Sequence, residues 1–236
     1  KPPFPAIQGY LRKPTIVNNV ETLAAVKYII RDGAAAYRKH GTEKSPGTKL
    51  FSVSGNVVKP GNYEVPLGTP LKDIIFDLCG GFKPGRKLKA VIPGGSSAPV
   101  LTADEAMKVT MDYEALAQMG SMLGSGAIIV MDDSNSMVDM LDVLMHFYHH
   151  ESCGQCTPCR EGTGWLAKIM HRIKDGHGET KDIDLLKTVA ERMMGKTICA
   201  LSDAAAMPAI SFVTKFRDEF ETYIKKGDKV GGAIHA

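Results

Sequence analysis

Three cysteines at three-residue intervals constrain this chain more than any other feature of its sequence. The segment ESCGQCTPCREG places Cys153, Cys156 and Cys159 in a C-x2-C-x2-C pattern. Only two further cysteines, Cys79 and Cys199, are present among the 236 residues. An odd number of cysteines, with three of them so close together, is typical of a metal site in a reducing compartment rather than of a secreted disulfide framework.

Composition and charge narrow the classes of function that are open to the chain. Its net charge of +3 is small and dispersed, which does not favour nucleic acid as a partner. No apolar run approaches the roughly 18 residues of a membrane span, and the N-terminus lacks a signal-peptide pattern. We therefore expect no direct membrane insertion, so that any membrane association comes through a partner protein.

Residues 1–46 are expected to open as an extended, proline-rich segment and to continue as a helix. Thr22 is a candidate for the helix cap, and Gly33 interrupts the helical pattern. The apolar residues that share one face of this helix are Leu23, Val26, Ile29 and Ile30.

Residues 47–133 change to the short period of a strand and predict a compact α+β domain. Brief alternating runs are separated by Ser-Gly, Pro-Gly and Leu-Gly turns, and KLKAVIPGG and AIIVMDD read as two further strands. A single short helix is expected in TPLKDIIFDLCGGF. The residues of this helix that are expected to point inward are Leu71, Ile74, Ile75 and Leu78.

Residues 134–236 contain four amphipathic helical segments joined by short loops, a pattern typical of a helix bundle. The first segment opens with Ser136 and Asp139 at the spacing of a capping box. The last is expected to run unbroken through SDAAAMPAISFVTKFRDEFETYIKK. Trp165 and Leu185 are among the residues that we expect to face the core of the bundle.

The topology of such a bundle predicts where a fourth cysteine ligand lies. The triplet falls in the connection between the first and second helices, and Cys199 falls between the third and fourth. In an up-down-up-down bundle these two connections lie at the same end. We therefore expect Cys199 to meet Cys153, Cys156 and Cys159, whereas Cys79 is expected to be a small core residue of the α+β domain.

The spacing of the cysteines favours an iron–sulfur cluster over zinc. Zinc sites usually show two ligand pairs, whereas C-x2-C-x2-C with one distant cysteine is the ferredoxin-like spacing of a [4Fe–4S] cluster. Zinc and thiol redox or disulfide chemistry stay open as alternatives, and the rival function is a zinc-stabilised module that binds a ligand or partner. The backbone amides of Gly154, Gln155 and Thr157 are expected to donate hydrogen bonds to the sulfurs.

Several motifs together resemble the NADH-binding flavoprotein subunit, also called the F subunit, of respiratory complex I. These are KPPFPA, PTIVNNVETL, GTKLFSVSG, VIPGGSS, ESCGQCTPCREG and GKTICAL, in the same order and over nearly the whole chain. The resemblance implies the end of an FMN- and NADH-binding α/β domain at 1–46 and a small β-grasp domain of the soluble-ligand-binding type at 47–133. It implies a four-helix bundle with one [4Fe–4S] cluster at 134–236. The residues that match the cluster ligands of the family are Cys153, Cys156, Cys159 and Cys199.

The resemblance also assigns a cofactor contact that the residues alone do not. In the family, the Asn-Asn-x-x-Thr segment lies against FMN, which corresponds to Asn18, Asn19 and Thr22 of this chain. Taken by themselves, these residues are typical of a turn that leads into a helix.

The function that the resemblance implies is electron transfer within an enzyme, NADH:quinone oxidoreductase. NADH reduces FMN in the complete enzyme, and single electrons then pass through the cluster toward quinone. The implied partners are the thioredoxin-like [2Fe–2S] subunit and the large iron–sulfur subunit, with a cytoplasmic location, peripheral on the inner membrane. No general acid, base or nucleophile is expected from this chain.

The chain departs from the family at its beginning. The glycine-rich loop of the family, which holds the NADH and FMN phosphates, lies upstream of the KPPFPA motif with which this chain starts. We therefore expect a C-terminal part of such a subunit, which by itself does not oxidise NADH. Diaphorase subunits of NAD-reducing hydrogenases and formate dehydrogenases share the motifs, but the lack of further cysteines in GDKVGGAIHA favours complex I.

Overall fold

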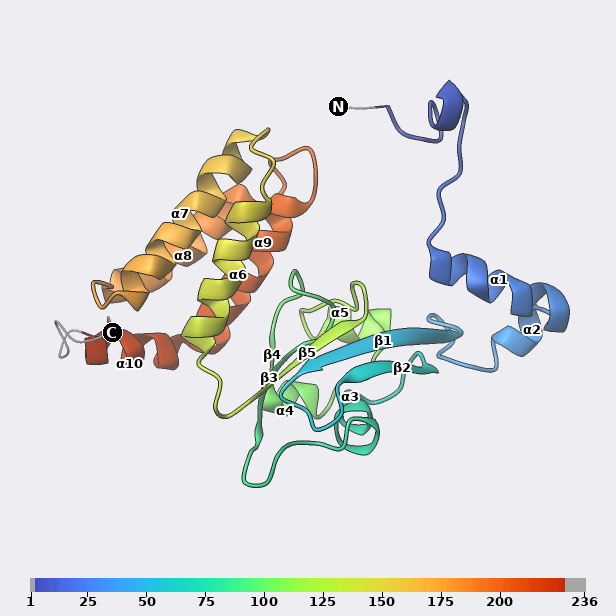
Figure 1. The fold of residues 1–236 in the computed structure, drawn as a ribbon, viewed down its shortest axis with the longest axis horizontal. Coiled ribbons are helices and arrows are strands. Elements are labelled where there is room, and N and C mark those ends of the chain that lie inside the picture. The colour runs from blue at the N-terminus through green and yellow to red at the C-terminus, as the bar shows by residue number, and fades with distance from the viewer. Residues whose placement is uncertain (1–2, 228–236) are drawn as a thin grey trace.

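The computed structural model describes residues 3–227, and its five-stranded sheet lies between an N-terminal helical segment and a helix bundle (Figure 1). The architecture is mixed α+β, as the sequence predicts. Residues 228–236, on which the expected preference for complex I over a diaphorase subunit was based, lie outside the described part of the chain.

The N-terminal segment forms a 3-10 turn, Tyr10–Arg12, followed by helix α1, Val20–Asp32, and the short α2, Ala34–Tyr37. The opening is therefore not extended throughout. Asn19 caps α1 by accepting a hydrogen bond from the Glu21 amide at 2.8 Å. The prediction of Thr22 as the cap is wrong, because the helix already begins before it.

Helix α1 ends where the sequence predicts, but its apolar face is not buried. Gly33 follows the helix with a φ of 86°, a conformation that glycine adopts at little cost. The face that carries Leu23 and Ile30 is exposed, with Ile30 79% accessible. Periodicity identified this face correctly as apolar, and within the described residues most of that face is exposed.

The sheet has the β-grasp arrangement. Its strands are β1 (Thr48–Gly55), β2 (Gly61–Pro66), β3 (Leu88–Ile92), β4 (Leu101–Thr102) and β5 (Ala127–Asp132). Their order is β2-β1-β5-β3-β4, in which the central β1–β5 pair is parallel and the other pairs are antiparallel. The first and last strands of the domain therefore meet at its centre.

Short helices cover one face of the sheet: α3 (Leu71–Asp73), which continues as a π-helical turn over Ile74–Leu78, α4 (Ala103–Ala106) and α5 (Tyr113–Gln118). Within the helix expected here, Leu71, Ile74 and Ile75 are buried as predicted. Leu78 is 38% exposed, so that prediction is wrong. A π-helical turn has a longer repeat than an α-helix, which rotates Leu78 away from the buried side.

At β3 and β5 the sheet is covered on both faces, and the two faces belong to different cores. Phe51, Ile128 and Val130 pack with the short helices of the domain. Ile92 and Met131 belong instead to the core that the bundle forms. Because successive side chains of a strand point to opposite faces, a strand such as β5 contributes to both cores and reads as continuously apolar.

The bundle consists of α6 (Met137–Glu151), α7 (Thr157–Lys174), α8 (Thr180–Met193) and α9 (Leu201–Lys215). A further helix, α10 (Arg217–Gly227), follows a break at Phe216, so the expectation of one unbroken last helix is wrong. The predicted cap of α6 is confirmed, since Ser136 Oγ accepts from the Asp139 amide at 3.2 Å.

Two residues that were expected in the core of the bundle lie at its surface. Trp165 is 53% exposed and Leu185 is 42% exposed, whereas the adjacent Leu166 and Leu186 are fully buried. Leu166 and Leu186 were expected in the core as well, so each predicted face is correct but one residue too wide. No helix within residues 3–227 is long and apolar enough to cross a membrane.

Candidate iron–sulfur centre

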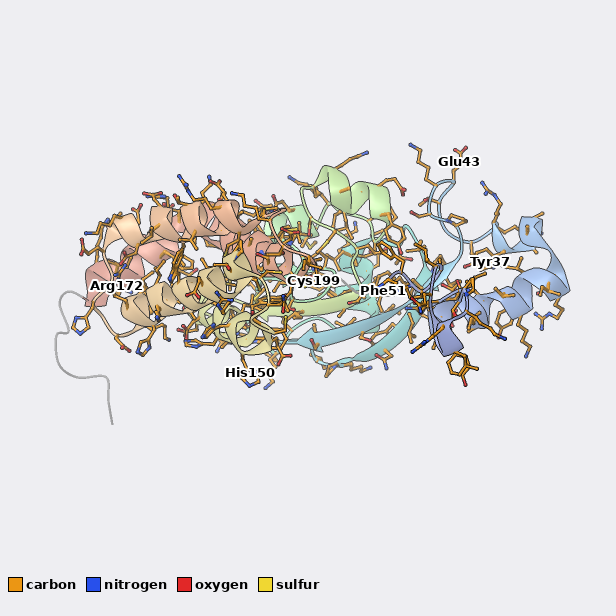
Figure 2. The ribbon with its side chains drawn as sticks, turned by 90° about the horizontal axis from the view of Figure 1, so that it is seen from above. Tyr37, Glu43, Phe51, His150, Arg172 and Cys199 are labelled. Carbon is orange, nitrogen blue, oxygen red and sulfur yellow. The ribbon has the colours of Figure 1, made fainter. Side chains whose placement is uncertain are left out.

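The α6–α7 and α8–α9 connections lie at the same end of the bundle, as its topology predicts (Figure 1). Figure 2 looks onto this end, where Cys199 is labelled. The backbone amide of Ile198 donates a hydrogen bond to Cys156 Sγ at 3.5 Å. The loop that carries Cys199 is therefore in direct contact with the loop that carries the triplet.

The three cysteines of the triplet differ in exposure because they lie at different points of the loop and helix. Cys153 is exposed in the loop, and Cys156 is the N-cap residue of α7. Cys159 lies in the first turn of α7 and is only 7% exposed. Cys199 is exposed and lies just before Ala200, the N-cap residue of α9.

Both cysteine-bearing loops thus lead into the N-terminus of a long helix. The N-terminal end of a helix carries a partial positive charge, which stabilises nearby anions and lowers the free energy of a thiolate relative to a thiol. With α7 and α9 beginning at the same end of the bundle, the local field favours an anionic group there.

Hydrogen bonds hold the triplet loop in shape. Ser152 Oγ lies 3.2 Å from Cys159 Sγ, and the Gly154 amide donates to Ser152 Oγ at 3.3 Å. Arg160 Nη1 donates to the Gly154 carbonyl at 2.8 Å, which ties the loop to the first turn of α7.

The expected donors to the sulfurs are not the ones that the structure contains. The Gly154 amide bonds to Ser152 rather than to a sulfur, and within residues 3–227 no such bond is made by Gln155 or Thr157. The Ile198 amide donates to Cys156 Sγ instead, and Ser152 Oγ shares a hydrogen bond with Cys159 Sγ. In the sequence, the contact of Ser152 is indicated only by its position next to Cys153. The contact of the Ile198 amide has no sequence signal, because every residue other than proline has a backbone amide.

The donor set fits an iron–sulfur cluster better than a hard cation. Four thiols are available from two contacting loops, and thiolates are the ligands of such clusters. As the side chains stand, however, no three histidine, cysteine or acidic residues within 3–227 lie close enough to hold a metal ion.

Cys79 does not belong to this end of the molecule. It is fully buried in the core of the sheet domain, which confirms the prediction of a core residue. Burial raises the pKa of the Cys79 thiol, which keeps it protonated and poorly suited as a ligand.

The three residues assigned to FMN contact lie on the N-terminal segment, on the far side of the sheet from the bundle (Figure 1). Asn18, Asn19 and Thr22 are all exposed. Asn19 also lines a cavity of about 870 Å³ between α1, α2 and β1, which Asn18 and Thr22 do not line. The structure therefore does not bring the three residues together around this cavity.

The same cavity contains an ion pair between Glu21 and Lys49, at 2.7 Å. Burial by itself would raise the pKa of Glu21, but the hydrogen bonds from Lys49 and the Leu50 amide outweigh it and lower that pKa. Glu21 therefore remains ionised and joins α1 to β1.

Two family models match the chain. The NADH-ubiquinone oxidoreductase-F iron-sulfur binding region matches residues 139–223, a range that includes all four cysteines of the two loops. The SLBB domain matches residues 50–101, within the sheet domain.

Similar proteins carry related names. The chain is 49% identical to the F 2 subunit of NADH-quinone oxidoreductase from Rhizobium meliloti, over 96% of this chain and 53% of that protein. It is 47% identical to the F subunit of NADH-quinone oxidoreductase from Mycobacterium bovis, over 96% of this chain and 51% of that protein. The chain thus spans about half the length of these relatives.

Among solved structures, a chain of the NAD+-reducing [NiFe]-hydrogenase in the air-oxidized state is similar, with a TM-score of 0.85 and 36% identity. The match covers 95% of this chain and 38% of that one. The identity is lower than with the quinone oxidoreductase subunits. In its motifs, its fold and these likenesses, the chain resembles a part of the F subunits of NADH-quinone oxidoreductase that includes their iron–sulfur binding region.

Proposed function

We propose that this chain is the electron-transfer part of an NADH dehydrogenase flavoprotein subunit of complex I. In that role it passes single electrons from FMN, reduced by NADH, through a [4Fe–4S] cluster toward quinone. The observation that carries the proposal is the contact between the two cysteine loops, through the Ile198 amide and Cys156 Sγ at 3.5 Å. The relatives named as F subunits of NADH-quinone oxidoreductase support the same role.

The ligands in this proposal are Cys153, Cys156, Cys159 and Cys199. When bound, such a cluster accepts and gives up one electron at a time. The chain contributes the four thiolates, two helix N-termini that stabilise their charge, and a buried position at Cys159 that excludes water from one side.

We infer FMN and NADH from the resemblance to the F subunits, and not from a complete binding site in this chain. Asn18, Asn19 and Thr22 are proposed to contact FMN, and all three are exposed and available to a neighbouring cofactor. NADH is proposed as the substrate of the whole subunit.

The proposed partners are subunits of the same complex, namely the thioredoxin-like [2Fe–2S] subunit and the large iron–sulfur subunit. The proposed location is cytoplasmic, peripheral on the inner membrane through that complex. We also propose that the chain divides at residues 46 and 133, since the sheet spans Thr48 to Asp132 and the bundle begins at Met137.

A diaphorase subunit of an NAD-reducing hydrogenase is the second candidate. The likeness to the NAD+-reducing [NiFe]-hydrogenase supports it, at a TM-score of 0.85. The higher identity to the quinone oxidoreductase subunits, 49% against 36%, favours the first candidate.

Substitution of the fourth ligand tests the proposal. Cys199→Ser is expected to lose or convert the four-iron cluster, because serine replaces a soft thiolate by a weaker oxygen donor. Cys79→Ser is the matched control, and it should keep the wild-type content of iron and sulfide per folded chain. The measurement is iron and acid-labile sulfide together with the EPR spectrum of the reduced protein. A full cluster that survives unchanged in Cys199→Ser would exclude Cys199 as the ligand.

A further inference from the structure

Ser152 connects the end of α6 to the cluster loop, and its hydroxyl faces the most buried cysteine of the site. It directly follows α6, with extended backbone angles, φ −65° and ψ 123°. Its Oγ lies 3.2 Å from Cys159 Sγ. Of the three cysteines of the triplet, Cys159 is the one that is buried.

The direction of this hydrogen bond follows from the other partner of the hydroxyl. A serine hydroxyl has one proton to donate and two lone pairs. The Gly154 amide, which can only donate, occupies one lone pair at 3.3 Å. The hydroxyl proton remains available, and a Cys159 thiolate can only accept it. Ser152 is therefore the donor whenever Cys159 is ionised.

A donor to a ligand sulfur changes the energy of the redox states unequally. Reduction adds negative charge that spreads over the sulfurs, and a hydrogen bond stabilises the more negative state more strongly. The effect is larger where water is excluded, because the local dielectric is low. Cys159, at 7% exposure, meets that condition.

We propose that Ser152 is a positioning residue that raises the reduction potential of the cluster through its hydrogen bond to Cys159 Sγ. This inference rests on the proposed function. The same hydroxyl fixes the loop by accepting from Gly154, so that one side chain both shapes the loop and sets the charge at one ligand.

The test compares two variants of nearly equal shape, Ser152→Thr and Ser152→Val, in the full chain purified with its cluster. Threonine keeps the hydroxyl and valine replaces it by a methyl group. The midpoint potential, from an EPR-monitored redox titration, is expected to stay near the wild-type value in Ser152→Thr. It is expected to shift to a more negative value in Ser152→Val, with iron and sulfide content unchanged.

Thr157→Ala is the matched control, since it removes an exposed hydroxyl between Cys156 and Cys159. Its potential should equal that of the wild type. Equal potentials in the Thr and Val variants would overturn the role of Ser152 while leaving the cluster in place. A wild-type chain with zinc and no sulfide would instead defeat the proposed function, and metal analysis detects that before any titration.

Discussion

At the scale of single residues, glycines with positive φ set the turns around the sheet, and two of them differ only in their surroundings. Gly55 ends β1 with a φ of 90°, and Gly85 precedes β3 with a φ of 82°. A Cβ atom at Gly55 would lie 2.1 Å from the Val130 carbonyl oxygen, whereas a Cβ at Gly85 has nothing within 4 Å. A comparison of Gly55 with Gly85 therefore distinguishes the cost of backbone strain from the cost of a steric clash.

Alanine at each position is therefore expected to give different losses of stability. Gly85→Ala should cost about 1 kcal/mol, the strain of a left-handed conformation. Gly55→Ala should cost about 3 to 5 kcal/mol, because the methyl group also forces the central β1–β5 pair apart. Urea denaturation of both variants measures this difference. Equal losses of unfolding free energy would mean that β1 and β5 accommodate the methyl group without loss of stability.

The cysteine pattern was readable from the sequence because ligand spacing is local, and its meaning did not depend on packing. The donors to the sulfurs were not readable in the same way. Gly154 turned out to bond to Ser152 Oγ, since the direction of an amide in a loop depends on backbone angles that spacing does not determine. Likewise Asn19, not Thr22, caps α1, because several polar residues in a row compete for one helix start.

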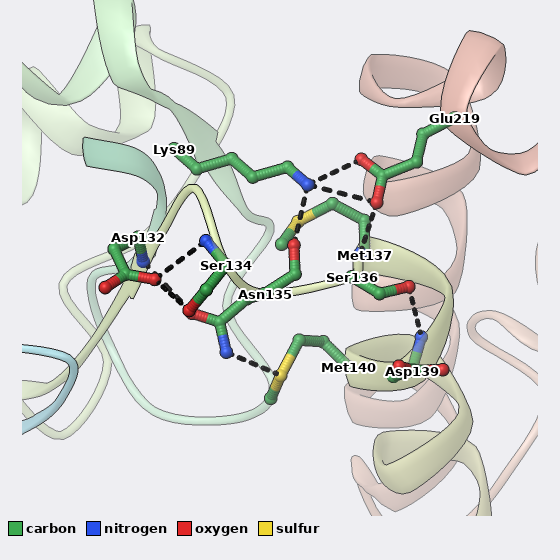
Figure 3. Close-up of polar contacts among 9 residues, drawn as sticks. All are labelled: Lys89, Asp132, Ser134, Asn135, Ser136, Met137, Asp139, Met140 and Glu219. Atoms are coloured by element: carbon green, nitrogen blue, oxygen red, sulfur yellow. Dashed lines mark hydrogen bonds and ion pairs between the residues drawn. The ribbon is translucent and has the colours of Figure 1, made fainter. Parts of the chain in front are cut away.

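At the scale of elements, Glu219 of α10 joins the sheet to the bundle (Figure 3). Its carboxylate accepts from the Met137 amide, the first of α6, at 2.8 Å. It also pairs with Lys89 of β3 at 2.8 Å, and Lys89 Nζ donates in turn to the Asn135 carbonyl at 2.6 Å. One side chain thus satisfies a helix N-terminus and an ammonium group.

Removal of the Glu219 carboxylate is expected to reduce stability more than the loss of an ordinary surface ion pair does. Glu219→Ala should lower the free energy of unfolding by about 1 to 3 kcal/mol, because it leaves a partly buried ammonium and an amide without their partner. Glu191→Ala is the control, since its contact to Lys187 is long, at 4.0 Å, and half exposed. It should cost less than about 0.5 kcal/mol. A similar loss in both variants, measured by chemical denaturation, would contradict the role of Glu219.

The hydrophobic period of the sequence predicts the helices of the bundle and their order. It predicts only in part which residues of each helix are buried and where each helix ends. The period of 3.6 residues predicts which face is apolar but does not determine how wide its buried part is, and for this reason Trp165 and Leu185 were expected inside together with their buried neighbours. No glycine or proline stands at Phe216, so the sequence does not predict that the helix breaks there. The break lets α10 turn so that Glu219 reaches α6 and β3.

At the scale of the whole molecule, the sheet and the bundle are held together by a shared core and by polar contacts across it. Lys215 of α9 pairs with Glu105 of α4 at 2.7 Å, and Ser211 Oγ accepts from the Val100 amide at 3.0 Å. Burial alone would raise the pKa of Glu105, but hydrogen bonds from Lys215 and the Thr102 amide outweigh it and lower that pKa below 4.5.

This lowered pKa predicts a pH dependence of stability. A carboxylate with a lowered folded-state pKa contributes stability above its unfolded pKa, and the contribution is lost as the pH falls through the folded pKa. The difference in unfolding free energy between wild type and Glu105→Gln should therefore be largest at neutral pH and shrink below pH 4.5. Urea titrations across this range measure it. A difference that stays constant with pH would contradict the contribution of the charge.

The apolar face of α1 marks the limit of what periodicity can predict at this scale. Leu23 and Ile30 have the pattern of a buried face, yet nothing within residues 3–227 covers them. Periodicity reports that a face is apolar and does not report what packs on it. The position of the two cysteine loops at the same end of the bundle, by contrast, was predicted from the order of the helices and their short connections alone.

Metal analysis is the decisive test of the proposal that the four cysteines of the bundle hold a [4Fe–4S] cluster. Iron, acid-labile sulfide and zinc are measured per chain after anaerobic purification. A [4Fe–4S] cluster requires about four iron and about four sulfide per chain, with negligible zinc. About one zinc without sulfide would contradict the proposal, since the loops would then form a structural zinc site and the electron-transfer function would be lost.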